Sequence, residues 1–309
     1  MSATEAAADE RCASCGIAGG GDINLKDCTA CKLVKYCGVE CQRNHRKQHK
    51  RACKEQAAVL RDELLFKQPE STHLGDCPIC LLPIPIATSD ETMAYSIYSC
   101  CSKLVCTACG VANALREIEE RLPSRCPFCR TLYQSTDEKI DLNEKIDLNK
   151  TMKRVKVNDP LALHNMGMKS FNAGDYATAT EYFEKAAELG NIESHFAISV
   201  AYDKGQGVET NIKKAIYHAE QAAIGGHPNA RHSLGMWEEG NGNIDAVKHF
   251  IIAANLGYDD SLQKLKEYYT LGVFSKEDFA AALRAHQAAV DATRSPQRDA
   301  AAAANVAHG

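Results

Sequence analysis

The cysteines constrain this chain more than any other feature. All fifteen fall before residue 130, and most occur as pairs separated by two residues. Two thiolates at that spacing can bind one zinc ion from a tight turn, and two such pairs complete a tetrahedral site. The first run, residues 12–53, reads C-x2-C, C-x2-C, C-x3-C and H-x3-C in order. It therefore offers eight ligands and predicts two zinc ions.

A second run of cysteines between residues 77 and 129 supplies eight further ligands. With one histidine, the fifteen cysteines make sixteen ligands, enough for four four-coordinate zinc sites. The candidate ligands are Cys12, Cys15, Cys28, Cys31, Cys37, Cys41, His49 and Cys53 in the first run, and Cys77, Cys80, Cys100, Cys101, Cys106, Cys109, Cys126 and Cys129 in the second.

A disulfide framework is the other common use of so many cysteines. The odd count and the C-x2-C pairing favour zinc and a reducing compartment, so we expect a cytoplasmic or nuclear location. The amino end lacks a basic region followed by an apolar core, and no apolar run approaches the roughly 20 residues that cross a bilayer. We therefore expect no membrane partner.

Residues 12–53 resemble the MYND zinc finger, with Tyr36 before Cys37, Gln42 after Cys41 and the closing H-x3-C. Spacing alone is compatible with sequential or interleaved pairing of the ligands. The resemblance implies interleaving, with Cys12, Cys15, Cys37 and Cys41 on one zinc and Cys28, Cys31, His49 and Cys53 on the other. It also implies a module at 11–55 that binds peptides or proteins. Arg46 departs from the family at a position on the peptide-binding surface that usually holds tryptophan.

Two histidines, His45 and His49, lie four residues apart in a segment that we expect to be helical. Only His49 stands one helical turn before a cysteine, so we predict that His49 is a ligand and His45 a surface residue. The basic run at 43–54 contains no aromatic residue that could stack on bases, and the net charge is −4. Nucleic-acid binding is therefore not favoured.

Residues 76–131 resemble a RING domain, a cross-braced fold with two zinc ions, and follow a helical linker at 56–75. The sequence CPIC opens the module and CPFC closes it. The middle departs from the family, because adjacent cysteines replace Cys-x-His and Lys103 occupies the usual histidine position. If only one of the adjacent cysteines is a ligand, that zinc has three protein ligands. The resemblance implies Cys77, Cys80, Cys106 and Cys109 on one zinc, and Cys100, Cys101, Cys126 and Cys129 on the other.

The RING resemblance implies a ubiquitin ligase that binds a conjugating enzyme and positions its thioester, so no residue is predicted to be catalytic. The partner-binding positions that it implies are Ile79, Leu115, Ile118, Pro127 and Arg130. The alternative for Ile79 and Leu115 is packing in a small core, and for Arg130 a surface charge. No Glu or His is placed as a base within the motif, so a hydrolytic zinc is not expected.

An internal repeat begins at Asp159, after a polar linker at 132–158 that contains EKIDLN twice and has helical tendency. Its second helices end in EKAAELG, EQAAIGG and IIAANLG, where the final glycine is expected to be left-handed. The first helices align at small residues, each followed four positions later by a large apolar residue. These pairs are Ala162 and Met166, Ser194 and Ile198, Ala230 and Leu234, and Ser261 and Leu265.

The repeats resemble Sel-like repeats, helical hairpins related to tetratricopeptide repeats, most clearly in the loop at 205–208. The resemblance covers 159–292 and implies a stacked solenoid whose concave face binds proteins. The aromatic residues at helical spacing are expected mainly to pack between repeats. The tails at 1–10 and 293–309 lack the large apolar residues of a core, so we expect disorder there.

The sequence thus predicts a mostly α protein: two small cross-braced zinc modules, MYND-like and RING-like, followed by an α-helical repeat solenoid. It predicts four zinc ions and protein partners, possible conjugating enzymes among them. One interpretation is a RING-type ubiquitin ligase or ligase adaptor that recruits partners through the first module and the repeats. The alternative is a non-enzymatic scaffold in which all three modules only bind proteins. A methyltransferase with a MYND insertion is excluded because no cofactor-binding segment remains.

Overall fold

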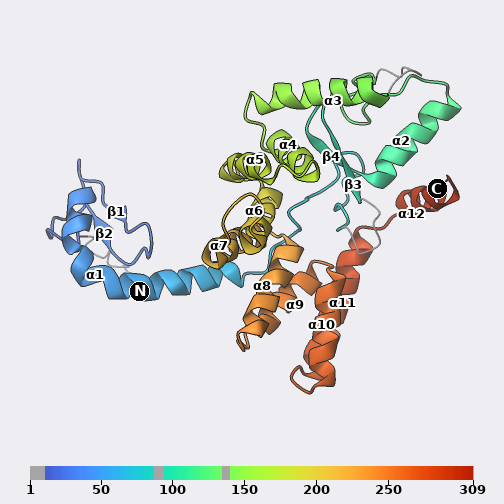
Figure 1. The fold of residues 1–309 in the computed structure, drawn as a ribbon. Coiled ribbons are helices and arrows are strands. Elements are labelled where there is room, and N and C mark those ends of the chain that lie inside the picture. Colours follow the sequence, from blue (N-terminus) through green and yellow to red (C-terminus); the bar gives the residue numbers. More distant parts are fainter. Residues whose placement is uncertain (1–10, 87–93, 134–139, 309) are drawn as a thin grey trace, which may run out of the picture. The chain divides into compact units, whose positions relative to one another are not determined.

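The computed structural model describes residues 11–86, 94–133 and 140–308 (Figure 1). It consists of two compact units, one ending at Lys67 and the other beginning at Gln68. The fold is mostly α-helical, with a cysteine-rich amino-terminal region and a helical repeat array, as the sequence predicts. Among the described residues, no helix is both long enough and apolar enough to cross a bilayer.

Unit 1 contains a short hairpin and one long helix. Strands β1 (Lys26–Asp27) and β2 (Lys35–Tyr36) pair antiparallel, and α1 (Val39–Leu65) follows. The helix covers the first part of the predicted linker, ending before residue 68. The fully buried residues of this unit's core are Cys12, Cys28, Cys31 and Tyr36. Because three of these four are candidate zinc ligands, metal binding supplies a large part of the folding free energy in such a unit.

Unit 2 begins with the second cysteine-rich module. Strands β3 (Tyr95–Tyr98) and β4 (Lys103–Cys106) form an antiparallel hairpin, and α2 (Thr107–Glu119) continues directly from β4. The core is again built largely from cysteines, together with Ile84 and Val105, which are 1% and 0% exposed.

The polar segment at 132–158 contains α3 (Ile140–Val155), in agreement with its expected helical tendency. The first copy of the duplication begins outside the described residues. The helix packs against α4 (Pro160–Asn172), and its Thr151 is 2% exposed. Arg154 contacts Asp159 at 2.8 Å, and Asp159 caps α4 by accepting from two backbone N–H groups. Tertiary contacts therefore stabilise the helix of this polar segment.

The repeats form four helical hairpins, as the alignment predicts. Their first helices begin with the aligned small residues buried, and all four apolar partners except Met166 are buried as well. Gly190, Gly226 and Gly257 each have φ between 85° and 90°, in the left-handed region. The hairpins are α4 with α5 (Tyr176–Glu188), α6 (Ile192–Lys204) with α7 (Ile212–Ile224), α8 (Pro228–Gly240) with α9 (Ala246–Asn255), and α10 (Asp259–Thr270) with α11 (Lys276–Ala292).

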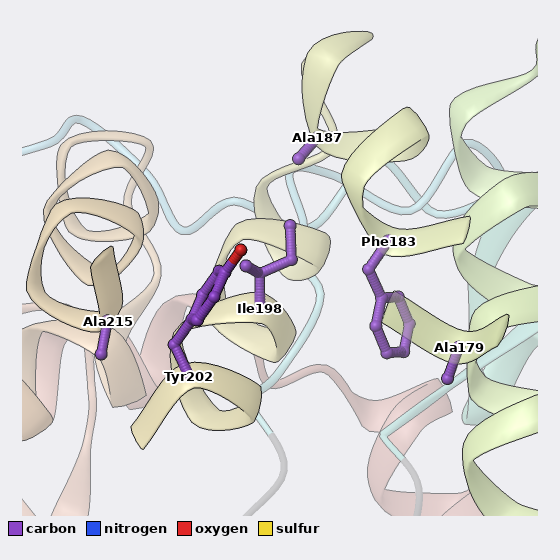
Figure 2. Packing of buried hydrophobic residues seen from close by; sticks show 6 residues of the cluster. All are labelled: Ala179, Phe183, Ala187, Ile198, Tyr202 and Ala215. Atoms are coloured by element: carbon purple, nitrogen blue, oxygen red, sulfur yellow. The ribbon is translucent and has the colours of Figure 1, made fainter. Parts of the chain in front are cut away.

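Buried side chains join successive hairpins into one array. Figure 2 shows Phe183 of α5, Ile198 and Tyr202 of α6 and Ala215 of α7 in one cluster, which joins the first hairpin to the second. Trp237 of α8 packs against the same cluster, so three hairpins share it. Phe183, Tyr202 and Trp237 thus pack between repeats, as expected of the aromatic residues. Tyr176, Tyr217 and Tyr269 are instead at least 38% exposed.

The loop of the second hairpin, residues 205–208, fits closely against the first. Gly207 has φ +75°, and a Cβ atom there would lie 2.3 Å from the carbonyl oxygen of Tyr176. Only glycine allows this approach of two backbones. The loop that most clearly carries the repeat resemblance is thus an inter-repeat contact.

The expected disorder of the tail at 293–309 is wrong for most of its length, because α12 (Pro296–His308) forms there and packs against α2. Arg298 is 7% exposed and donates hydrogen bonds to the carbonyl oxygens of Pro83 (2.7 Å) and Leu82 (3.1 Å). Alanine has the highest helix propensity, and one buried arginine supplies the anchor that the tail's small side chains cannot.

Candidate metal centres

The structure brings the sixteen candidate ligands together in four groups. Within each group, the ligand atoms all lie within 4.8 Å of one another. The grouping is interleaved along the chain rather than sequential, as both resemblances imply. The groups are Cys12, Cys15, Cys37 and Cys41; Cys28, Cys31, His49 and Cys53; Cys77, Cys80, Cys106 and Cys109; and Cys100, Cys101, Cys126 and Cys129.

The distances between sulfur atoms fit tetrahedral zinc. Zn–S bonds of about 2.3 Å set the sulfur–sulfur separation in a regular tetrahedron at about 3.8 Å. The Sγ atoms of Cys28 and Cys53 lie 3.8 Å apart, and those of Cys80 and Cys106 lie 3.9 Å apart. All fifteen cysteines are free, so the described residues contain no disulfide. Thiolate and imidazole donors at this spacing are the ligands that structural zinc prefers.

Each C-x2-C turn that begins at Cys12, Cys28, Cys77 or Cys126 closes in the same way. The residue four positions after the first cysteine donates its N–H to that cysteine's carbonyl oxygen, at 2.8–3.0 Å. That residue also has φ between 54° and 73°. It is glycine only at Gly16, and the others are Lys32, Leu81 and Arg130. A non-glycine residue there costs about 1–2 kcal/mol, which the hydrogen bond of the turn and a bound metal would offset.

Backbone donors at these turns favour the thiolate. Burial raises the pKa of the Cys28 thiol, but the N–H groups of Cys31 and Ala30 outweigh it and lower that pKa to about 6. Burial likewise raises the pKa of Cys129, whereas the hydroxyl and N–H of Thr131 lower it to about 6. Because zinc binds the thiolate, these donors favour metal binding by Cys28 and Cys129, whereas burial raises the pKa of Cys53 and Cys101 in the same groups.

The adjacent cysteines both reach the same group. Cys101 Sγ lies 3.8 Å from Cys126 Sγ, and Cys100 Sγ lies 3.4 Å from Cys129 Sγ. The following residue, Ser102, has φ +48°, which provides the sharp bend that adjacent ligands require. The arrangement therefore fits four protein ligands rather than three. Lys103 is exposed, and its ammonium lies 5.8 Å from the centre of the Phe128 ring.

The two candidate histidines of unit 1 occupy different positions, and His45, expected at the surface, is half-buried. His49 is buried, and its Nε2 lies 3.1 Å from Cys31 Sγ. His45 lies outside the group, with its Nδ1 3.2 Å from the hydroxyl of Tyr36. The His45 ring stacks on His49 at 5.7 Å between centroids. His45 is thus placed to orient the buried ligand ring rather than to bind zinc.

The implied partner-binding residues of the second module have unequal exposure. Ile79 and Ile118 are 39% and 73% exposed, and Leu115 is half-buried. Pro127 is buried, so the structure does not support a direct contact between its side chain and a partner. Arg130 is exposed, and its guanidinium donates to Asn113 Oδ1 of α2 at 3.1 Å.

Sequence reasoning missed a fifth group, formed by His73, Glu193 and His227. The Glu193 carboxylate oxygen Oε2 lies 2.5 Å from His73 Nε2 and 3.1 Å from His227 Nε2. His73 also donates its backbone N–H to the carbonyl oxygen of Gly226 at 3.1 Å. The group therefore fastens the segment before the second cysteine module to the loops between repeats. The one sequence signal is that His227 precedes a proline at a helix start.

This fifth group does not fit a metal. The Nδ1 atom of His227 accepts the N–H of Ala230 at 3.2 Å and caps α8, so a neutral ring carries its proton on Nε2. A metal at Nε2 would move that proton to Nδ1, where it would face the N–H of Ala230, which is also a donor. We interpret the group as a carboxylate paired with two histidines.

The His73–Glu193–His227 group is expected to make unit 2 sensitive to acid. Burial raises the pKa of Glu193, but the two histidines lower it well below its usual range, so this stabilisation is lost as the pH falls. Burial lowers the pKa of His227, and Glu193 only partly offsets this. Burial also lowers the pKa of the neighbouring His164 on α4, to about 4. A histidine that stays neutral in the folded protein destabilises the fold below the histidine's unfolded pKa of about 6.5. The free energy of unfolding should therefore fall between about pH 6.5 and pH 4.

Thermal unfolding followed by circular dichroism at pH 7.5 and pH 5.5 checks this expectation. The control is the His227→Asn variant, whose Asn cannot titrate and can still cap α8. Zinc content is measured for both proteins at each pH, because acid also releases zinc. The parent should lose more stability than the variant between the two pH values, and equal losses at equal zinc content would contradict the assignment.

Comparisons with known proteins agree with two of the three modules. A MYND finger model matches residues 12–53, and a Sel1 repeat model matches residues 160–191 and 192–227. The HcpC protein of Helicobacter pylori strain J99 is 43% identical over 56 residues, which is 18% of this chain and 19% of that protein. HcpC of strain 26695 is also 43% identical, over 51 residues, which is 16% of this chain and 18% of that protein. The chain thus spans about a fifth of these relatives' length.

Two solved structures are similar to part of this chain. One is a Sel1 repeat protein from Oxalobacter formigenes, with a TM-score of 0.41 and 25% identity, covering 46% of this chain and 64% of that one. The other is a protective antigen of uropathogenic Escherichia coli strains displaying an SLR fold, with a TM-score of 0.40 and 25% identity, covering 48% of this chain and 33% of that one. The chain carries a MYND finger, which is a zinc-binding protein-interaction module, and Sel1 repeats in a helical array.

Proposed function

We propose that this protein is a zinc-dependent RING-type ubiquitin ligase that recruits partners through its MYND finger and its repeats. The observation that carries the proposal is the exposure of large apolar side chains on the second cysteine-rich module. Five of them are at least 39% exposed although the module has little apolar core of its own, and apolar side chains exposed in such number favour a protein-binding role. They are Ile79, Leu81, Ile118, Leu122 and Phe128.

Such a ligase works by positioning. The apolar surface would bind the conjugating enzyme, and the thioester chemistry would take place on that enzyme. Arg130 suits an orienting role because its backbone closes the C-x2-C turn that begins at Cys126. Its guanidinium also donates a hydrogen bond to Asn113. A donor fixed in this way loses little freedom when a second protein binds.

A non-enzymatic scaffold is the second candidate, and α12 favours it. The helix packs against α2, and Arg298 binds the carbonyl groups of Leu82 and Pro83 beside the first zinc turn. Contacts within the chain thus already use part of the module that a conjugating enzyme would need.

Discharge of ubiquitin from charged conjugating enzymes separates the two candidates. Ile79→Ala should remove apolar contact worth about 1–3 kcal/mol and abolish most activity through a weakly held partner. Arg130→Ala should leave binding nearly unchanged and slow discharge, because its role is orientation. Val157→Ala, also at an exposed apolar residue (73%), is the control and should behave like the parent. If the parent does not raise the discharge rate above the rate measured without it, for any conjugating enzyme in a panel, the scaffold is the remaining candidate.

A further inference from the structure

A groove in unit 1 runs along one face of α1, beside the second cysteine group. Its volume is about 490 Å³, and its lining includes Tyr36, Val39 and Ala57 together with ligands of that group. Val39 is 65% exposed at one end, so the groove presents apolar surface to solvent. An apolar side chain of a partner could therefore be buried there.

Four basic side chains line this groove and no acidic one does. They are spaced by three, four and four residues, which places them on one face of the helix. All four are exposed, and none pairs with a carboxylate among the residues that the structure describes. The ion pair between Arg51 and Glu55, at 2.9 Å, involves residues outside the lining. The four are Arg43, Arg46, Lys50 and Lys54.

The zinc centre beside the groove does not cancel this charge. Three thiolates, one neutral imidazole and Zn²⁺ would carry a net charge of about −1. The four cations therefore leave the groove with an excess of about three positive charges. An anionic ligand is favoured, and a cationic one is opposed.

We infer that the groove binds an acidic segment of a partner protein, with an apolar side chain over the floor and carboxylates along the basic row. The inference rests on the proposed role of the first module in recruiting a partner. From Arg43 to Lys54 the helix rises about 17 Å, which an extended segment of about five residues spans. The aromatic rings in the lining are those of Tyr36 and His49, which are 3% and 8% exposed, so the groove offers no surface for stacking bases. This favours an acidic peptide over a nucleic acid.

A displayed library of random twelve-residue peptides, selected on the full zinc-loaded chain, tests the inference. We expect the enriched peptides to carry Asp or Glu next to a large apolar residue. In fluorescence anisotropy, the Arg46→Glu, Lys50→Glu double variant should bind them at least tenfold more weakly than the parent. Replacing their acidic residues by lysine should restore binding to that variant.

The matched control is the Lys47→Glu, Arg51→Glu double variant, which makes the same charge change on α1 at residues outside the groove lining. It should bind within twofold of the parent. Zinc content is measured by native mass spectrometry for every variant, because Lys50 follows the candidate ligand His49.

Three results would overturn the inference. Enriched peptides without acidic residues would show that charge does not select the ligand. Equal effects of the two double variants would show that general electrostatics, and not the groove, causes binding. A single-stranded oligonucleotide that binds more tightly than the peptides would identify a nucleic acid instead. If no peptide is enriched, or all bind outside unit 1, the recruiting role of the first module itself fails, while ligase activity is tested separately by discharge.

Discussion

Removing zinc with a chelator is expected to unfold residues 11–67 and 76–131 and to leave most of the helical signal of residues 160–292 intact. The reason is the composition of the cores. In unit 1 and in the second module, candidate ligands make up much of what is buried, whereas the repeats bury ordinary side chains such as Phe183, Ile198 and Phe250. Structural zinc contributes about 10–16 kcal/mol to the folding of zinc-finger peptides, more than such small cores can replace.

Hydrogen exchange measured by mass spectrometry resolves the regions in one experiment. Amides of α2 and of the β1–β2 and β3–β4 hairpins should lose protection, and those of α6 and α8 should keep it. The control is the same chelator saturated with zinc beforehand, which should change nothing. Equal loss of protection in the repeats and in α2 would mean that the array depends on the metal.

Leu234→Asp is expected to destabilise the repeat array by several kcal/mol. Leu234 is 4% exposed on α8, in the third of four hairpins, and an unpaired carboxylate there has no water to solvate it. Because each hairpin buries its apolar face against its neighbours, the damage should reach α6 and α10 as well.

Leu271→Asp is the control for this prediction, since Leu271 is 74% exposed after α10. It introduces the same charge in the same array and should unfold near the parent temperature. Thermal unfolding followed by circular dichroism compares the three proteins. A Leu234→Asp variant that melts like the parent would mean that Leu234 is not part of the core.

The sequence predicts those structural elements that a short stretch of residues determines by itself. Cysteines two residues apart must meet at a turn, and a repeat with small residues at fixed positions must stack, so ligand groups and hairpins follow from spacing. The sequence indicates helical tendency in the segment of α3, but the contacts that hold α3 and α12 in place cannot be predicted in this way. The first is held by Thr151 and the Arg154–Asp159 pair, and the second by Arg298 on two distant carbonyl groups.

The same difference between local and long-range contacts decides which candidate sites the sequence predicts. The fifth group joins His73 to Glu193 and His227, residues separated by more than a hundred positions, so no local pattern marks it. The left-handed conformation of the residues after the C-x2-C pairs could not be predicted either. Glycine is the usual residue in that conformation, whereas these positions hold Lys32, Leu81 and Arg130. The resemblance also does not fix exposure. Pro127 and Ile79 are both implied as partner-binding residues, yet the first is buried and the second exposed.

The central claim is that the four interleaved groups each hold one zinc ion. Native mass spectrometry of the full chain, purified without chelator, counts bound metal directly. The expected result is four zinc ions per chain, falling below four in a Cys106→Ser variant, which removes one ligand. Two ions or fewer in the parent would contradict the organisation proposed for this protein.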